Sequence, residues 1–165
     1  MTNNVRARRG GLRKGLLAAT LAVATSGQAH SEDIIVGVAT SFSGWMAAFD
    51  TNPTRAAQLA VDEINANGGL LGNQLELVHV DTKTDQAETA RAAQELVSAG
   101  AKVIMVACDF DMGAPAALVA QQAGIIAMSS CGADDKLGNM TIGNNVFTMA
   151  TEADGTGRML ADWAY

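Results

Sequence analysis

One stretch of this sequence, residues 55–72 (RAAQLAVDEINANGGLLG), predicts its own local structure and thereby limits the folds open to the chain. Its apolar residues recur at helical spacing and share one face of a helix: Ala57, Ala60, Val61 and Ile64. The Asn-Gly-Gly at residues 67–69 tolerates the left-handed backbone that closes a helix, and an apolar run follows at residues 75–80. A one-sided helix followed closely by a strand is typical of one repeat of an α/β sheet.

Capping residues predict where the helices begin. Asn52 before Pro53 predicts the start of the first helix, because asparagine can cap free N–H groups and proline at the first helical position loses no hydrogen bond. Pro115 is interpreted in the same way as the opening of a later helix. Between them, Asp85 is predicted to cap a helix, with Glu88 as its capping-box partner.

The remaining apolar runs repeat the alternation of strand and helix. The predicted strands are Ile34–Ala39, Leu75–Val80, Val103–Ala107, Ile125–Met128 and Val146–Met149. Helical patterns separate the first four strands, and a last helix reaches Tyr165. This order predicts an α/β fold, a doubly wound parallel sheet with helices on both faces. Ligands of such sheets bind outside the carboxyl ends of the strands, so the loops that follow the strands form the candidate site.

The first 29 residues have the layout of a secretory signal peptide. Residues 1–14 are basic, residues 15–23 are a short apolar run, and small residues precede a possible cleavage site after Ala29. The apolar run is too short to span a bilayer, which needs about 20 residues. We therefore expect export to the periplasm. A disordered or weakly anchored tail is the alternative interpretation.

The charge of the chain is uneven and argues against two classes of partner. Its net charge is −6, but residues 1–31 carry five basic and no acidic residues, which leaves −11 on the remainder. A body this acidic is a poor partner for nucleic acid, whose phosphates need lysine and arginine, and for an anionic membrane surface. We predict that neither binds this chain.

Motifs for catalysis or cofactor binding are missing from the sequence. It contains no phosphate-binding loop of the G-x-x-x-x-G-K type, no G-x-G-x-x-G after the first strand and no G-x-S-x-G nucleophile motif. Beyond residue 31 the only histidine is His79, which lies in a predicted strand and is interpreted as structural. An enzyme would have to rely on Cys108, Asp109 and Asp111 without an evident base. We therefore predict no catalytic residues, no cofactor and no metal site.

The loops after the predicted strands hold acids and aromatics that could contact a ligand. Asp109 and Asp111 follow the third strand, where they either cap the next helix or meet a polar group such as an ammonium or a hydroxyl. The aromatics expected in these loops are Phe42, Trp45, Phe49 and Phe110. Aromatic side chains on loops favour an apolar wall for a small ligand, with local packing as the alternative.

Two cysteines stand at corresponding places in the predicted sheet. Cys108 ends the third strand and Cys131 follows the fourth, and consecutive strands are usually neighbours. In an oxidising compartment such a pair is expected to form a disulfide. The alternative is two buried thiols that pack as small apolar groups.

Several segments, taken in order, resemble those of a known family. They are Ser43-Gly44, AVDEINANGGLLG, the Asp81–Asp85 segment, VIMVA, GIIAMSS and VFTMATEADGTGRMLADWAY. From about Ile34 to Tyr165 the chain resembles the N-terminal part of the type I periplasmic solute-binding proteins of the leucine/isoleucine/valine-binding family. The resemblance implies two α/β lobes joined by a hinge, which close over a solute and then dock on the membrane permease of an ABC importer.

The resemblance also implies ligand-binding positions. They are Ser43, Phe49, Asp109, Phe110, Asp111, Gly132 and Ala133. In the family, the loop matched by residues 108–111 and the turn matched by residues 131–133 use hydroxyl groups to hold an amino-acid carboxylate. Residues 108–111 contain no serine, and Ala133 replaces a hydroxyl residue, while two acids are added. These differences disfavour a branched-chain amino acid and leave open a neutral or cationic polar solute, an alcohol or an amide.

The predicted domain organisation is a signal peptide at residues 1–29, an N-terminal α/β lobe at residues 30–150 and the start of a connection to a second lobe at residues 151–165. The family's chains are more than twice as long, so we expect a chain truncated before the second lobe. The predicted function is an exported receptor of an ABC importer that binds a small, amino-acid-like polar solute. An extracytoplasmic ligand-sensing domain of a receptor or regulator is the alternative, because the same fold serves both.

Overall fold

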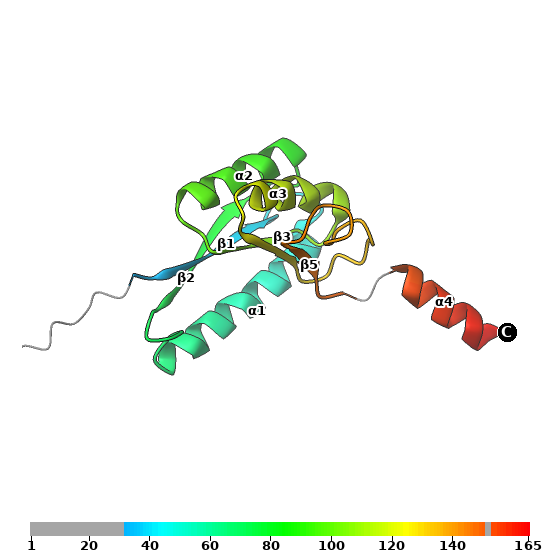
Figure 1. Ribbon diagram of the computed structural model, residues 1–165, viewed down its shortest axis with the longest axis horizontal. Coiled ribbons are helices and arrows are strands. Elements are labelled where there is room, and N and C mark those ends of the chain that lie inside the picture. The colour runs from blue at the N-terminus through cyan, green and yellow to red at the C-terminus, as the bar shows by residue number, and fades with distance from the viewer. Residues whose placement is uncertain (1–31, 151–152) are drawn as a thin grey trace, which may run out of the picture.

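The computed structural model describes residues 32–150 and 153–165, so the predicted signal peptide lies outside the described residues. The elements follow the order expected from the sequence (Figure 1). They are β1 (Ile34–Thr40), α1 (Ala47–Ala66), β2 (Leu75–Asp81), α2 (Gln86–Ser98), β3 (Val103–Val106), α3 (Phe110–Gln122), β4 (Ile126–Ser129), β5 (Val146–Thr148) and α4 (Ala153–Ala164). Every predicted strand is present, with ends within one residue of the expected ones.

The strands form one parallel sheet in the order β2-β1-β3-β4-β5. Helices α2 and α3 cover one face of this sheet and α1 covers the other (Figure 1). The doubly wound α/β prediction is therefore confirmed. The chain leaves β1 toward β2 on one side and leaves β3 toward β4 on the other, so the strand order reverses between β1 and β3. A crevice is expected outside the strand ends at that point.

The core lies between the sheet and the α2–α3 layer and is built largely from small side chains. Its fully buried alanines are Ala39, Ala92, Ala93, Ala107, Ala116, Ala117, Ala120 and Ala127. Larger buried residues such as Leu96 of α2 and Ile104 of β3 fill the space between them. Alanine on the facing sides of α2 and α3 lets the two helices pack closely against the sheet and against each other.

Both proline-based predictions of helix starts are wrong. Helix α1 begins at Ala47, so Pro53 lies in its second turn, and α3 begins at Phe110, so Pro115 lies in its second turn. In α3 the side chain of Asp109 caps the helix by accepting the N–H of Met112, which sets the start ahead of the proline. In α1 the first turn contains Asp50, whose carboxylate accepts the N–H groups of Ser41 and Cys108 and holds that turn in place ahead of Pro53. The predicted cap at Asp85 is present and accepts the N–H of Glu88.

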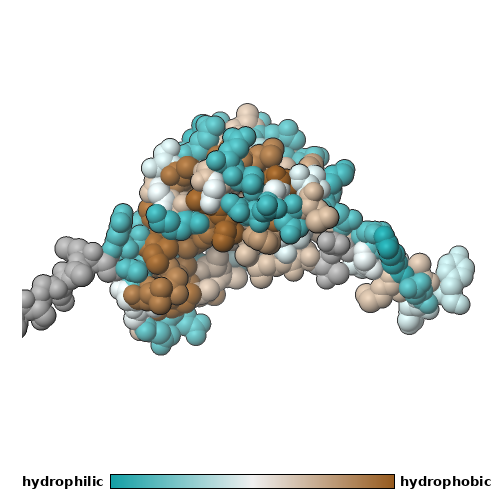
Figure 2. Space-filling view, in the orientation of Figure 1, coloured by the Kyte–Doolittle hydropathy of each residue, from teal (hydrophilic) through white to brown (hydrophobic). Residues whose placement is uncertain are grey.

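The predicted buried stripe of α1 is only partly correct. Val61 is buried, but Ala60 and Ile64 are exposed and Ala57 is half-buried. A groove of about 410 Å³ remains between α1 and the sheet, lined by Val36, Pro53, Ala56, Ala57, Val103, Met105, Met128, Ser130 and Met149. In Figure 2 the lower edge of the body is tan along its middle and brown toward the left, with teal at its lower left end. The helix therefore covers its face of the sheet incompletely.

Helix α4 extends away from the body of the molecule (Figure 1) and buries none of its residues. Its large apolar side chains, Met159, Leu160 and Trp163, are all exposed. Within the described residues, no helix is both long and apolar enough to cross a membrane.

Candidate functional site

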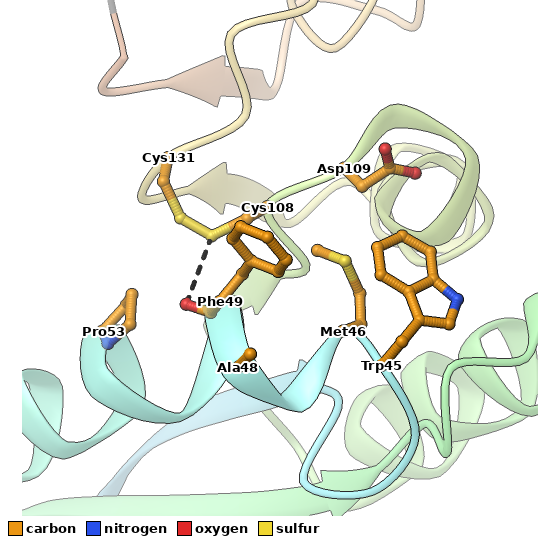
Figure 3. A pocket seen from close by; sticks show the side chains of 8 residues that line it. All are labelled: Trp45, Met46, Ala48, Phe49, Pro53, Cys108, Asp109 and Cys131. Carbon is orange, nitrogen blue, oxygen red and sulfur yellow. Dashed lines mark hydrogen bonds between the residues drawn. A yellow bond between two sulfur atoms is a disulfide. The ribbon is translucent and has the colours of Figure 1, made fainter.

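A cleft of about 440 Å³ opens beside the end of β3, where the strand order reverses (Figure 3). Its lining residues are Trp45, Met46, Ala48, Phe49, Pro53, Cys108, Asp109 and Cys131. They come from the loop after β1, the first turns of α1 and the loops after β3 and β4. The cleft therefore lies where a doubly wound sheet is expected to bind its ligand.

Asp50, in the first turn of α1, holds two of these loops together. Its carboxylate is 1% exposed and accepts the main-chain N–H of Ser41 at 2.8 Å and that of Cys108 at 3.0 Å. Burial raises the pKa of Asp50 above its usual value, the two N–H groups oppose this shift, and the nearby charge of Asp109 adds to it. Asp50 was not predicted from the sequence, although it is an acid next to Phe49 in an otherwise apolar turn.

Asp81, at the end of β2, orders the loop that follows β1. It accepts hydrogen bonds from the N–H of Phe42, the hydroxyl of Ser43 and the N–H of Lys83, at 2.8–2.9 Å. Burial acts to raise the pKa of Asp81, but these bonds together outweigh it and hold the pKa below its usual value. Ser43, a predicted ligand residue, thus directs its hydroxyl at Asp81 and is not among the residues that line the cleft.

The glycine of the Ser43-Gly44 pair is required by backbone geometry. Gly44 has φ of +80°, in the left-handed region that glycine adopts readily. A Cβ at this position would lie 2.4 Å from the Thr84 hydroxyl oxygen, and that hydroxyl donates to the Ser43 carbonyl at 2.8 Å. The Ser-Gly pair therefore positions the first loop.

Of the four aromatic residues expected at the cleft, two line it and two do not. Trp45 and Phe49 line it and lie edge to face, with ring centroids 6.4 Å apart, and Figure 3 shows their rings on either side of Met46. Phe42 instead lies against His79, with ring centroids 3.8 Å apart, and Phe110 is half-buried against the core. Phe49 and Phe110 lie in helices and not in the loops predicted from the sequence.

His79, interpreted from the sequence as structural, contacts the main chain of β1. Its Nε2 lies 3.3 Å from the Thr40 carbonyl oxygen, and burial lowers the pKa of its imidazole, against the opposing effect of that contact. It is not among the residues that line the cleft.

Cys108 and Cys131 form a disulfide with their Cα atoms 4.8 Å apart, as the sequence predicts. The bond joins the loop after β3 to the loop after β4, and both cysteines line the cleft. Together with the hydrogen bond to Asp50, it fixes the position of Cys108 on two sides. One wall of the cleft is thus built from covalently joined loops.

The two acids after β3 have different environments. Asp109 caps α3 and lines the cleft, whereas Asp111 lies exposed in the first turn of α3 and does not line it. Phe110, between them, lies under the ammonium of Lys136, whose Nζ is 5.7 Å from the ring centroid. The expected capping role therefore falls to Asp109 alone.

The predicted second binding turn makes hydrogen bonds to the end of β4 and to the start of α4. Gly132 is buried, and its N–H donates to the Ser129 hydroxyl at 2.9 Å. The carbonyl of Ala133 accepts the N–H of Ala153 at 2.9 Å. Neither Gly132 nor Ala133 lines the cleft.

A parallel sheet with a crevice at its strand-order reversal defines a doubly wound α/β lobe, a class in which such crevices are the usual ligand sites. A sequence model described as periplasmic binding protein matches residues 33–165. The chain belongs to the periplasmic binding protein family, which confirms the resemblance seen in the sequence.

Three relatives illustrate how much of such a protein the chain covers. The Leu/Ile/Val-binding protein of Escherichia coli is 37% identical over 92 residues, which are 56% of this chain and 25% of that protein. The amino acid binding protein of Pseudomonas aeruginosa is 33% identical over 120 residues, 71% of this chain and 32% of that protein. The crystal structure of the branched-chain amino acid transporter substrate binding protein LivJ from Streptococcus pneumoniae, in complex with isoleucine, matches with a TM-score of 0.69 and 32% identity. That match covers 73% of this chain and 34% of the other, so the chain spans a quarter to a third of the length of these relatives.

Proposed function

We propose that this chain is the N-terminal lobe of an exported receptor that binds a small, amino-acid-like polar solute for an ABC importer. The observation that carries the proposal is the cleft at the strand-order reversal, whose wall combines Trp45 and Phe49 with the Cys108–Cys131 disulfide. Apolar walls with a few polar groups are typical of small-molecule sites. The names of the relatives support the solute class, since they bind amino acids or are seen with isoleucine.

We propose binding without chemistry. Cys108 and Cys131, the cysteines among the described residues that line the cleft, are joined to each other and offer no thiol. Asp109 uses its carboxylate to cap α3, and no histidine is among the described residues that line the cleft. The relatives are named as binding proteins, which agrees with this interpretation.

The proposal includes a location and a partner. Residues 1–29 would direct export to the periplasm, residues 30–150 would form the lobe, and residues 151–165 would begin the connection to a second lobe. The exposed apolar side chains of α4 support that last assignment, because they find no partner among the described residues of the lobe. The membrane permease of the importer would recognise the two-lobed receptor after it closes on its solute.

A thermal-shift screen of the chain against amino acids, amides, alcohols, amines and sugars tests the proposal. A solute that binds the native state raises its melting temperature by mass action. Phe49→Ala should abolish the shift, whereas Phe42→Ala, which removes an aromatic ring outside the cleft, should preserve it. No shift with any class, up to solute concentrations of about 10 mM, would reject the receptor function for this cleft.

A further inference from the structure

The charge among the residues that line the cleft is negative only. Among its lining residues Asp109 is the only one with a charge, and that charge is negative; the others are apolar or aromatic, or belong to the disulfide. The buried Asp50 lies close enough for the charge of Asp109 to raise the pKa of the Asp50 carboxyl, in addition to the larger effect of burial. A ligand carboxylate placed here would meet negative charge without a lysine, arginine, histidine or hydroxyl from the lining residues.

A main-chain acceptor adds to this bias. Pro53 has no N–H, so the carbonyl of Phe49, four residues earlier in α1, lacks its usual helical partner. The Phe49 oxygen points toward the disulfide, 3.9 Å from the Cys108 sulfur, a contact drawn as a dashed line in Figure 3. A disulfide sulfur carries no proton, so this contact does not replace the missing hydrogen bond. The carbonyl thus lacks its i+4 helical donor and faces the disulfide at the cleft.

Besides the carboxylate and the main-chain carbonyl, two aromatic rings at the cleft could contact a cation. Trp45 is 61% exposed and Phe49 is 59% exposed, although both line the cleft. Aromatic faces attract organic cations, and tryptophan does so most strongly. Two aromatic rings, a carbonyl oxygen and a carboxylate around one cleft form a set that suits a positively charged nitrogen.

We propose that this cleft binds the ammonium group of a small organic cation. The inference rests on the proposed solute-binding function and names the class of solute. The rings of Trp45 and Phe49 would contact the cation, and Asp109 would balance its charge. Where the nitrogen carries a proton, the Phe49 carbonyl would accept it in a hydrogen bond.

Matched ligands of nearly equal shape test the charge. The chain has two tryptophans, so Trp163→Phe leaves Trp45, which lies at the cleft, as the only source of tryptophan fluorescence. The probes are choline, its uncharged isostere 3,3-dimethylbutan-1-ol, and isovalerate as the carboxylate. Choline should bind about tenfold or more tightly than either of the other two. Equal affinity for choline and the neutral alcohol, or tighter binding of isovalerate, would overturn the inference.

A pair of acid variants tests the position of the charge. Asp109→Asn keeps the capping ability of the side chain but removes the charge, and should weaken choline binding about five- to tenfold. Asp111→Asn makes the same change outside the cleft and should leave the affinity unaltered. An equal loss in both variants would mean that the net charge of the chain, rather than this site, attracts the cation.

If leucine or another zwitterion binds while choline does not, the receptor proposal stands and the cation inference fails. If none of the screened solutes binds, both fail.

Discussion

The carboxylate of Asp50, in the first turn of α1, accepts the main-chain N–H of Cys108, which lies 58 residues later in the chain. The other oxygen of the same carboxylate accepts the N–H of Ser41. One buried side chain therefore joins the loops that leave β1 and β3, the two strands between which the strand order reverses. The geometry of the cleft depends on this contact, because Cys108 lines it.

Removing the Asp50 carboxylate should destabilise the protein. In Asp50→Ala the N–H groups of Ser41 and Cys108 lose their acceptor, and each buried unpaired group costs roughly 1–3 kcal/mol. We expect the free energy of unfolding in urea to fall by about 2–4 kcal/mol. The control is Asp62→Ala, an exposed site on the same helix, which should change it by less than about 0.5 kcal/mol. Similar losses at both positions would contradict the role given to Asp50.

Asp50 and Asp81 should respond to pH in opposite directions. Burial raises the pKa of Asp50, so its contribution to stability is complete below the unfolded pKa and is lost as pH rises through the folded pKa. The pKa of Asp81 is lowered because hydrogen bonds to its carboxylate outweigh its burial, so its contribution is present above the unfolded pKa and is lost as pH falls through the folded value.

Urea unfolding from about pH 3.5 to about pH 7 measures both effects. The stability of the wild type relative to Asp50→Asn should decrease as pH rises over this range. The stability of the wild type relative to Asp81→Asn should increase over the same range. Slopes of the same sign for the two variants would show that one of the two pKa directions is incorrect.

The sequence predicts the fold well because its signals are local and repeated. Each strand is a short run rich in aliphatic residues, and each is recovered to within one residue. The two prolines led to wrong predictions of the helix starts. Proline favours the first helical position, but contacts made by an acidic residue ahead of each proline outweigh this preference. Asp109 caps α3, so that helix begins at Phe110, five residues before Pro115. Asp50 anchors the first turn of α1 ahead of Pro53.

The site was predicted less completely because its contacts are not local. Phe49, Asp109 and the disulfide were expected at the cleft and line it. Ser43 was expected there as well, but Asp81, which lies 38 residues away in the sequence, takes its hydroxyl. The role of Asp50 depends on Cys108, and no spacing rule relates residues so far apart.

The Cys108–Cys131 disulfide should contribute measurably to stability. A bond that closes a loop with a sequence separation of 23 is expected to contribute about 3 kcal/mol, mainly by restricting the unfolded chain. We expect a reducing agent to lower the urea midpoint of the wild type. The double variant Cys108→Ser/Cys131→Ser should begin at the lower midpoint and show no response to the reductant. Two titratable thiols in the unreduced, natively exported protein would contradict the bond.

Replacing Pro53 with alanine should raise the stability of the protein and lower its affinity for the ligand. Pro53→Ala supplies the missing N–H to the Phe49 carbonyl and removes a residue that disfavours the helix interior, so the protein should gain about 1–3 kcal/mol. The same hydrogen bond occupies the acceptor proposed for the cation, so the affinity for a protonated amine should fall about two- to tenfold. Pro115→Ala is the matched control, because that proline also lies in the second turn of its helix but does not line the cleft. It should raise stability and leave affinity unchanged. A stabilised Pro53→Ala variant with undiminished affinity for the amine would show that the Phe49 carbonyl does not contact the solute.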